Sequence, residues 1–212
     1  MFCSDITAPV FLIFSGEVPR LLYYSHIPTA IMALVVGFYV FSKKKGSDYL
    51  AADVLLFMSV SFFVWSLVDL ILWTNIGSDT IMFFWSLINL VELLVTAATL
   101  YFAYVFLEKR DAPFANKLVV CSLITFFAVL VPSGLNITGF NSVSCEAEQG
   151  ILTVYYYLLE TFFLLWLLGY LSKKVISAKK SEMKFVATFA IGVICFSASF
   201  SGANLISSLT ER

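Results

Sequence analysis

Six apolar segments dominate this chain, and each is long enough to cross a lipid bilayer as a helix. They cover approximately residues 21–42, 50–74, 80–107, 117–139, 151–172 and 184–208. A transmembrane helix needs roughly 20 consecutive apolar residues. Hydrophobic residues make up 60% of the chain and charged residues 13%, whereas soluble domains are about half apolar and a quarter charged. The sequence therefore predicts an all-α polytopic transmembrane helix bundle with six spans.

The placement of the basic residues predicts how this bundle is oriented. If the six segments alternate in direction, 11 of the 13 basic residues fall on one side, and only Arg20 and Arg212 fall on the other. Loops rich in Lys and Arg stay in the cytoplasm, so we expect the N-terminus to lie outside. Residues 1–20 precede the spans, which fill 21–212. We expect residues 1–20 to form an outer interfacial segment, and a re-entrant piece that caps the bundle is the alternative.

Four cysteines divide between the outer side and the spans. Cys3 and Cys145 both map to the outer side, where an oxidising environment permits a disulfide between them. Two free thiols are the alternative. Cys121 and Cys195 lie within spans, and we expect them to be small packing residues.

Polar side chains inside the predicted spans concentrate toward the outer end. The set comprises His26, Asp69, Asn89, Glu92, Glu160 and Asn204. At a rise of about 1.5 Å per residue, Asn89 and Glu160 lie about 14 Å from the outer ends of their helices, and Glu92 about 18 Å. The other three lie about 6–8 Å from those ends. A charge in the membrane costs about 2.5–3.5 kcal/mol on insertion scales and usually faces a bundle interior or a wet cavity.

Helical spacing places these polar residues on shared faces, which we expect to line the bundle interior. The faces are Trp85, Asn89, Glu92, Thr96 and Thr99; Ser59, Phe62, Ser66, Asp69 and Trp73; Tyr157 and Glu160; and Ser197, Ser201 and Asn204. We also expect Pro28 and Pro132 to kink the first and fourth helices.

Glu92 has competing interpretations. In one, Asn89, Glu92 and Glu160 form an interhelical hydrogen-bond network in which the acids are protonated. In another, the same groups face a cavity open to the outside and bind a small ligand or a cation. Direct proton or ion transport is the third. His26 is interpreted as a helix-end histidine or as a ligand contact whose titration range would suit a pH sensor.

The sequence contains no pattern for catalysis, for a metal or for a cofactor. A single histidine permits neither a multi-histidine metal site nor a Ser/His/Asp arrangement, and no G-x-G-x-x-G or C-x-x-C motif is present. The net charge of −1 does not indicate a nucleic-acid partner. We therefore expect no enzyme activity in this chain, no cofactor, no metal and no nucleic acid.

Two segments resemble a known family. The stretch CEAEQGILTVYYYLLE (Cys145–Glu160) resembles the outer loop and fifth helix of the N-terminal seven-helix sensor regions of bacterial histidine kinases. ANLISSLTER looks like the end of the sixth helix of those regions. The resemblance implies an input module in the bacterial inner membrane that works with a kinase, as a homodimer or with a kinase partner. The seventh helix and all kinase elements are missing from this sequence, and the family lends no catalytic residue to any position.

These observations favour a sensory or signal-transducing membrane module, in contact with the lipid bilayer. We expect Asp69, Asn89, Glu92 and Glu160, with His26 and Asn204, to recognise a small or lipidic ligand and so to bias helix packing. A small-solute or ion transporter or channel is the alternative function, and a structural subunit of a membrane complex is the third.

Overall fold

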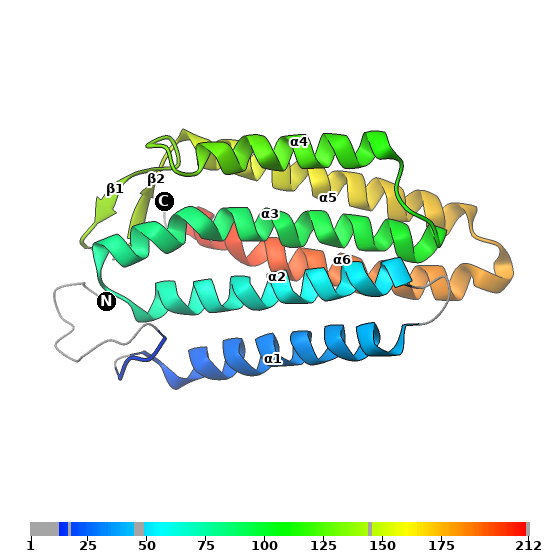
Figure 1. Ribbon diagram of the computed structural model, residues 1–212, viewed down its shortest axis with the longest axis horizontal. Helices are drawn as coiled ribbons and strands as arrows, with labels where there is room; N and C mark the ends of the chain where they lie inside the picture. Colours follow the sequence, from blue (N-terminus) through cyan, green and yellow to red (C-terminus); the bar gives the residue numbers. More distant parts are fainter. Residues whose placement is uncertain (1–12, 17, 45–48, 144–145, 211–212) are drawn as a thin grey trace.

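The computed structural model describes residues 13–16, 18–44, 49–143 and 146–210, with side chains described as far as residue 202. The helices are α1 (Arg20–Lys43), α2 (Tyr49–Thr74), α3 (Ser78–Glu108), α4 (Phe114–Leu130), α5 (Ile151–Ser177) and α6 (Lys180–Thr210). The strands β1 (Ile137–Asn141) and β2 (Glu146–Gln149) lie between α4 and α5 (Figure 1). Within the described chain, five helices, all except α4, are long and apolar enough to cross a membrane. The expected helical class is confirmed, and these five helices fit a multi-pass membrane protein.

Successive helices run in opposite directions, so the bundle has two chemically different ends. The connections α1–α2, α3–α4 and α5–α6 lie at one end, and the two strands lie at the other (Figure 1). Every described lysine lies in or within about one helical turn of those three connections, whereas Arg20 begins α1 at the opposite end. We call these the basic end and the hairpin end.

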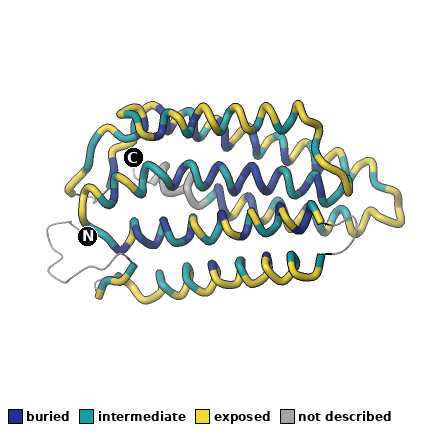
Figure 2. Tube along the Cα trace, in the orientation of Figure 1, coloured by how far each residue is buried: buried dark blue, intermediate teal, exposed yellow. Residues whose placement is uncertain are grey.

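Helix α3 is the centre of the bundle. It packs against α2, α4, α5, α6 and both strands. Its buried residues extend from Ile81 to Val105, and Figure 2 shows buried positions along most of its length. The main hydrophobic core joins α3 to α4, α5 and α6 through side chains such as Leu93, Phe127 and Phe163. Residues of α3 are therefore the ones best placed to form an interior site.

Helix α1 packs chiefly against α2, and the rest of its surface is exposed (Figure 2). Only Ala30 and Gly37 of this helix are buried. A Cβ built on Gly37 would lie 2.7 Å from both the Cβ and the Oγ of Ser59, so the missing side chain sets the helix separation. Small residues at such contacts are typical of helix packing in membranes.

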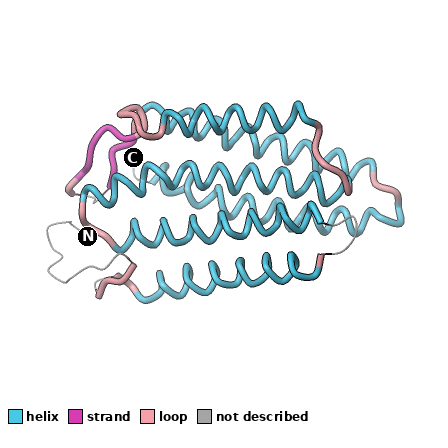
Figure 3. Tube along the Cα trace, viewed as in Figure 1, coloured by secondary structure: helices cyan, strands magenta, loops and turns pink. Residues whose placement is uncertain are grey.

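The fourth span was predicted over residues 117–139, and its boundaries are wrong. Helix α4 ends at Leu130 after 17 residues, and residues 131–136 form turns before β1 begins (Figure 3). Pro132 does not kink this helix as expected but follows its end, because proline lacks the N–H that would continue the helix. The apolar residues Leu135 and Ile137 extended the apparent span, since hydropathy alone does not distinguish a helix from the turns after it.

The segment between α4 and α5 was expected to be a loop, and the structure shows a hairpin there. Strands β1 and β2 pair antiparallel, with Ile137 opposite Gln149 and Asn141 opposite Glu146. The strands are short, and their main-chain pairing satisfies polar backbone groups at the end of the bundle. The hairpin therefore closes the bundle at this end.

The base of the hairpin is anchored to the helices by main-chain and side-chain hydrogen bonds. The N–H of Gly150 donates to the carbonyl of Asn136 over 2.8 Å. A Cβ on Gly150 would collide with the carbonyl oxygen of Leu135, so this close approach requires glycine. The buried Asn136 amide donates to the carbonyls of Val131 (3.3 Å) and Ser86 (3.4 Å). These contacts join the ends of α4 and α5 to α3.

The two last helices also extend beyond their predicted spans. Helix α5 continues to Ser177 and α6 begins at Lys180, where spans of 151–172 and 184–208 were expected. Lysine is a good helix former, so the helices continue past the apolar residues into the basic end. Most of the expected outer segment, residues 1–12, lies outside the described residues. In the described part, the N–H of Ser15 donates to the hydroxyl of Tyr23 over 2.8 Å, which places this part against the first turn of α1.

Candidate functional site

An ion pair between His26 and Asp69 links α1 to α2 near the hairpin end. The Nε2 of His26 lies 2.7 Å from the Oδ2 of Asp69, and the two side chains are 16% and 21% exposed. The Nδ1 lies 2.8 Å from the carbonyl oxygen of Leu22 and 2.9 Å from the Oγ of Ser25. A carbonyl and a carboxylate oxygen can only accept hydrogen bonds, so the geometry fits a protonated ring that donates from both nitrogens.

A second group of polar side chains lies in the bundle interior, where α3, α5 and α6 meet. Glu92 of α3 is 2% exposed and Glu160 of α5 is 5% exposed. The carboxyl group of Glu160 interacts with Ser201 of α6, with Tyr156 and with Glu92, and Tyr156 also interacts with Glu92. We call Glu92, Tyr156, Glu160 and Ser201 the interior polar cluster. The structure thus brings Glu92 and Glu160 together.

Several atoms of the interior polar cluster are buried without hydrogen bonds. The Oε1 of Glu160, the hydroxyl of Tyr156 and the hydroxyl of Ser201 have no partner of hydrogen-bond geometry among the described residues. The side chains approach one another, but these three atoms are not aligned for bonding. An unsatisfied buried polar atom costs about 1–3 kcal/mol, and such atoms are rare in native proteins. The cluster therefore has unused hydrogen-bonding capacity inside the bundle.

The six candidate residues do not converge on one site. Asp69 bonds to His26 of α1, whereas Glu92 and Glu160 meet where α3 packs against α5. Asn89 is buried on α3 about one turn before Glu92. The side chain of Asn204 lies outside the described residues. The sequence placed these groups at similar depths, but depth does not determine which helix interface each one faces.

The predicted polar faces are buried in part: Phe62, Asp69, Trp85 and Tyr157 are half-buried, and the side chain of Asn204 lies outside the described residues. The residues of these faces that are buried are Ser59, Ser66, Asn89, Glu92, Thr96, Thr99, Glu160, Ser197 and Ser201. Trp73 was expected in the interior and is 65% exposed. It lies in the last turn of α2, and indole rings favour the membrane–water interface at such helix ends.

Tyr156 is the residue of this site that the sequence analysis missed. Tyr157 was expected to share a face with Glu160, but Tyr156 is the tyrosine that is almost fully buried, at 1% exposed, and Tyr157 is half-buried. Positions four apart on a helix lie one above the other, as Tyr156 and Glu160 do. That spacing was the available signal.

The cysteines differ from expectation where they are described. Cys121 and Cys195 were expected to be small packing residues, and both are exposed free thiols. In α4 only Phe127 is buried, so Cys121 lies on the part of the helix that does not enter the core. A helix that is apolar all round carries no periodic signal to show which face is buried. Cys3 and Cys145 lie outside the described residues, so their disulfide stays a prediction.

Glu92 was expected to face a cavity open to the outside. A cavity lies on another face of α3, where its lining residues run from Leu94 to Tyr104. Neither Glu92 nor Glu160 lines it. The four residues of the interior polar cluster are each 7% exposed or less.

The described residues contain no group of three or more His, Cys, Asp or Glu side chains arranged to hold a metal ion.

No family model matches this chain, and no curated protein or solved structure is detectably similar to it. Inferences about function therefore depend on the chemistry and geometry of this chain's own residues.

Proposed function

We propose that this chain is an integral membrane input module for signal transduction, of the kind that acts with a bacterial histidine kinase. The observation that carries the proposal is the interior polar cluster. Its Glu160 Oε1 and the hydroxyls of Tyr156 and Ser201 are buried without a hydrogen-bond partner among the described residues. Ionisable groups placed at a helix junction inside a membrane bundle are costly and commonly functional. The sequence resemblance to kinase sensor regions supports the same class.

The chemistry of the interior polar cluster indicates the class of ligand. The unpartnered Oε1 of Glu160 is a carboxyl oxygen, which accepts hydrogen bonds. The side chains that interact with Glu160 in the described structure are Ser201, Tyr156 and Glu92, and none of them is basic. A small ligand with N–H donors supplies a partner for the Oε1 of Glu160. We therefore propose a small amine as the ligand.

The proposed signal is a change in helix packing. The interior polar cluster contains residues of α3, α5 and α6, so a ligand that bonds to all of them favours one arrangement of these helices. A ligand shifts such an equilibrium only by its difference in affinity for the two arrangements. We propose that the unsatisfied atoms of the cluster provide this difference in affinity. The ligand would form hydrogen bonds to them in one helix arrangement and not in the other.

We further propose six spans in a bacterial inner membrane, with the hairpin end outside and the basic end in the cytoplasm. The concentration of lysines at the basic end supports this orientation. Helix α4 is about 26 Å long at about 1.5 Å per residue, slightly less than the hydrocarbon thickness of about 30 Å. Its antiparallel position beside α3 and α5 supports its assignment as the sixth span (Figure 1).

The ligand proposal is tested by thermal unfolding of the purified chain with a panel of primary amines, using the corresponding alcohols as neutral controls. We expect an amine to raise the unfolding temperature of the wild type but not of Glu92→Gln or Glu160→Gln. Glu148→Gln changes an exposed acid on β2 and serves as the matched control, so it should respond as the wild type does. The absence of an amine-specific shift, or an equal shift in both cluster variants, would remove the site.

Two further measurements separate signalling from the alternatives. Uptake of the same amine by proteoliposomes, lost in Glu160→Gln, would replace the sensor with a transporter. For the kinase connection, we expect the intact mass of the native gene product to exceed the 23.7 kDa of this chain or a histidine kinase to co-purify with it. A product of 23.7 kDa without a kinase partner would contradict the connection.

A further inference from the structure

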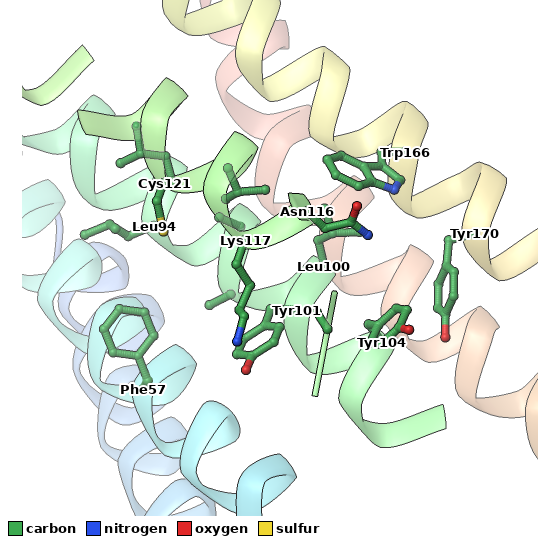
Figure 4. A pocket seen from close by; sticks show the side chains of 15 residues that line it. Phe57, Leu94, Leu100, Tyr101, Tyr104, Asn116, Lys117, Cys121, Trp166 and Tyr170 are labelled. Atoms are coloured by element: carbon green, nitrogen blue, oxygen red, sulfur yellow. The ribbon is translucent and has the colours of Figure 1, made fainter. Parts of the chain in front are cut away.

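A lateral groove opens between α2 and α4 on a face of α3 that the interior polar cluster does not use. Helices α2 and α4 both pack against α3 but make almost no contact with one another. A cavity of about 300 Å³ lies here, lined by side chains of α3, α4 and α5 and by Phe57 of α2 (Figure 4). Its volume is at the lower end of the range for small-molecule sites. We call this cavity the α2–α4 groove.

Small side chains on α3 produce this groove. Its floor includes the buried residues Ala97 and Ala98, and its walls include Phe57 of α2 and Trp166 of α5. Phe57 is 52% exposed, and Cys121 of α4, which also lines the groove, is exposed. The groove therefore opens sideways. In a bundle that crosses a membrane, that surface faces lipid rather than water.

Polar groups occur at the end of the α2–α4 groove nearest the basic end. Asn116 and Lys117, near the start of α4, line it together with Tyr101 of α3 (Figure 4). The Nζ of Lys117 donates to the Oδ2 of Asp111 over 2.6 Å, and the hydroxyl of Tyr101 donates to Oδ1 over 2.6 Å. An ammonium group has three donors, so Lys117 retains donors for a ligand at this position.

The charge at this polar end is positive. Residues 109–117 contain Lys109, Arg110 and Lys117 against the single acid Asp111. Glu108 adds a negative charge, and it forms ion pairs with both Lys174 and Arg110. The hydrogen bonds from Lys117 and Tyr101 hold the pKa of Asp111 below its usual range, so this acid is ionised at neutral pH. Its negative charge is paired with the ammonium group of Lys117. With Lys174 and Glu108 included, four basic residues and two acids lie at this end, so its net charge is positive.

We propose that the α2–α4 groove holds one acyl chain of an anionic phospholipid whose phosphate is bound by Lys117 and Asn116. The apolar part of the groove extends from this polar end toward Leu94, which is about 21 Å from the end of α3 at about 1.5 Å per residue. A phospholipid has this same order of parts, a charged headgroup followed by an apolar chain. Its source is the leaflet on the side of the basic end.

The proposal is tested by native mass spectrometry of the purified chain with phosphatidylglycerol or phosphatidylcholine. A Lys or Arg near an anionic membrane surface contributes about 1 kcal/mol. We therefore expect about fivefold greater retention of phosphatidylglycerol, reduced to near parity in Lys117→Gln. Lys180→Gln removes an exposed lysine at the same end of the bundle, on α6, and should keep the preference. Equal retention of the two lipids by the wild type would overturn the proposal, and so would an unchanged preference in Lys117→Gln.

Occupancy of the groove itself is tested by filling it and by labelling its thiol. We expect Ala98→Phe to lose bound lipid, and retention equal to wild type would place the lipid elsewhere. Because Ala98→Phe can fail to fold, a chain with Cys121 as its only cysteine gives an independent test. We expect maleimide to label Cys121 about fivefold more slowly in phosphatidylglycerol vesicles than in phosphatidylcholine vesicles. Equal rates would overturn the proposal.

Discussion

His26 and Asp69 are 43 positions apart in the sequence, and their side chains meet at 2.7 Å across the interface between α1 and α2. This pair holds α1 at the hairpin end. Gly37 packs closely against Ser59 nearer the middle of the helix, and a 2.6 Å pair between Lys44 and Asp53 lies at the basic end. Helix α1, of which only Ala30 and Gly37 are buried, is therefore attached to α2 at three levels.

Breaking the His26–Asp69 pair should destabilise the attachment of α1. We expect Asp69→Asn to lower the free energy of unfolding by about 1–2 kcal/mol, because a hydrogen bond between charged groups is lost at a partly buried site. Asp53→Asn breaks the more exposed Lys44 pair, whose acid is 48% exposed, and should cost less. Thermal unfolding in detergent micelles measures the loss of stability in each variant. Equal losses in Asp69→Asn and Asp53→Asn would contradict the expectation that the His26 pair contributes more than the Lys44 pair.

Gly37→Ala and Gly169→Ala should change stability in opposite directions. A Cβ at Gly37 meets Ser59 at 2.7 Å, whereas a Cβ at Gly169 of α5 meets nothing within 4 Å. Overpacking a close contact costs about 1–3 kcal/mol, and alanine gains up to about 1 kcal/mol in helix propensity over glycine. We therefore expect a lower unfolding temperature for Gly37→Ala and a higher one for Gly169→Ala. A stabilising Gly37→Ala would show that the helices separate freely.

Gly150→Ala should loosen the base of the hairpin. The added methyl group collides with the carbonyl oxygen of Leu135, which is a main-chain atom and can move only with the chain. We expect a loss of about 1–3 kcal/mol and faster hydrogen exchange at the N–H of Leu152, which donates to that carbonyl. Gly134→Ala adds the same group where nothing lies within 4 Å, and it should leave this exchange rate unchanged.

Acid should weaken the contact between the α3–α4 loop and α4 through Asp111. Its pKa is lowered in the folded chain by hydrogen bonds from Lys117 and Tyr101. A lowered folded pKa stabilises the fold above the unfolded value of about 3.9. That contribution is lost as the pH falls through the folded pKa. The acid is half exposed, so we expect a small effect, seen below about pH 4 as a fall in unfolding temperature that Asp111→Asn lacks. An identical acid profile in the variant would contradict this assignment.

Much of the bundle follows from local properties of the chain. Runs of apolar residues predicted every helix, and 3.6-residue spacing predicted that Glu92, Thr96 and Thr99 share a buried face. The end of α4 was missed, because Pro132 ends a helix in a stretch whose hydropathy continues to Ile137. The exposure of Cys121 was missed because an apolar helix carries no pattern to mark its buried side.

The sequence by itself predicted apolar helices long enough to cross a membrane. It also predicted the approximate limits of those helices and the helix faces on which their polar residues lie. These features depend on the hydrophobicity and the 3.6-residue spacing within each segment, so each segment can be interpreted without its neighbours. Only the tertiary structure decided which faces meet. It paired His26 with Asp69 between α1 and α2, gathered Glu92, Tyr156 and Glu160 between α3 and α5, and left the α2–α4 groove beside Ala98. Those contacts join residues far apart in the chain, and they arise from the packing of several helices at once.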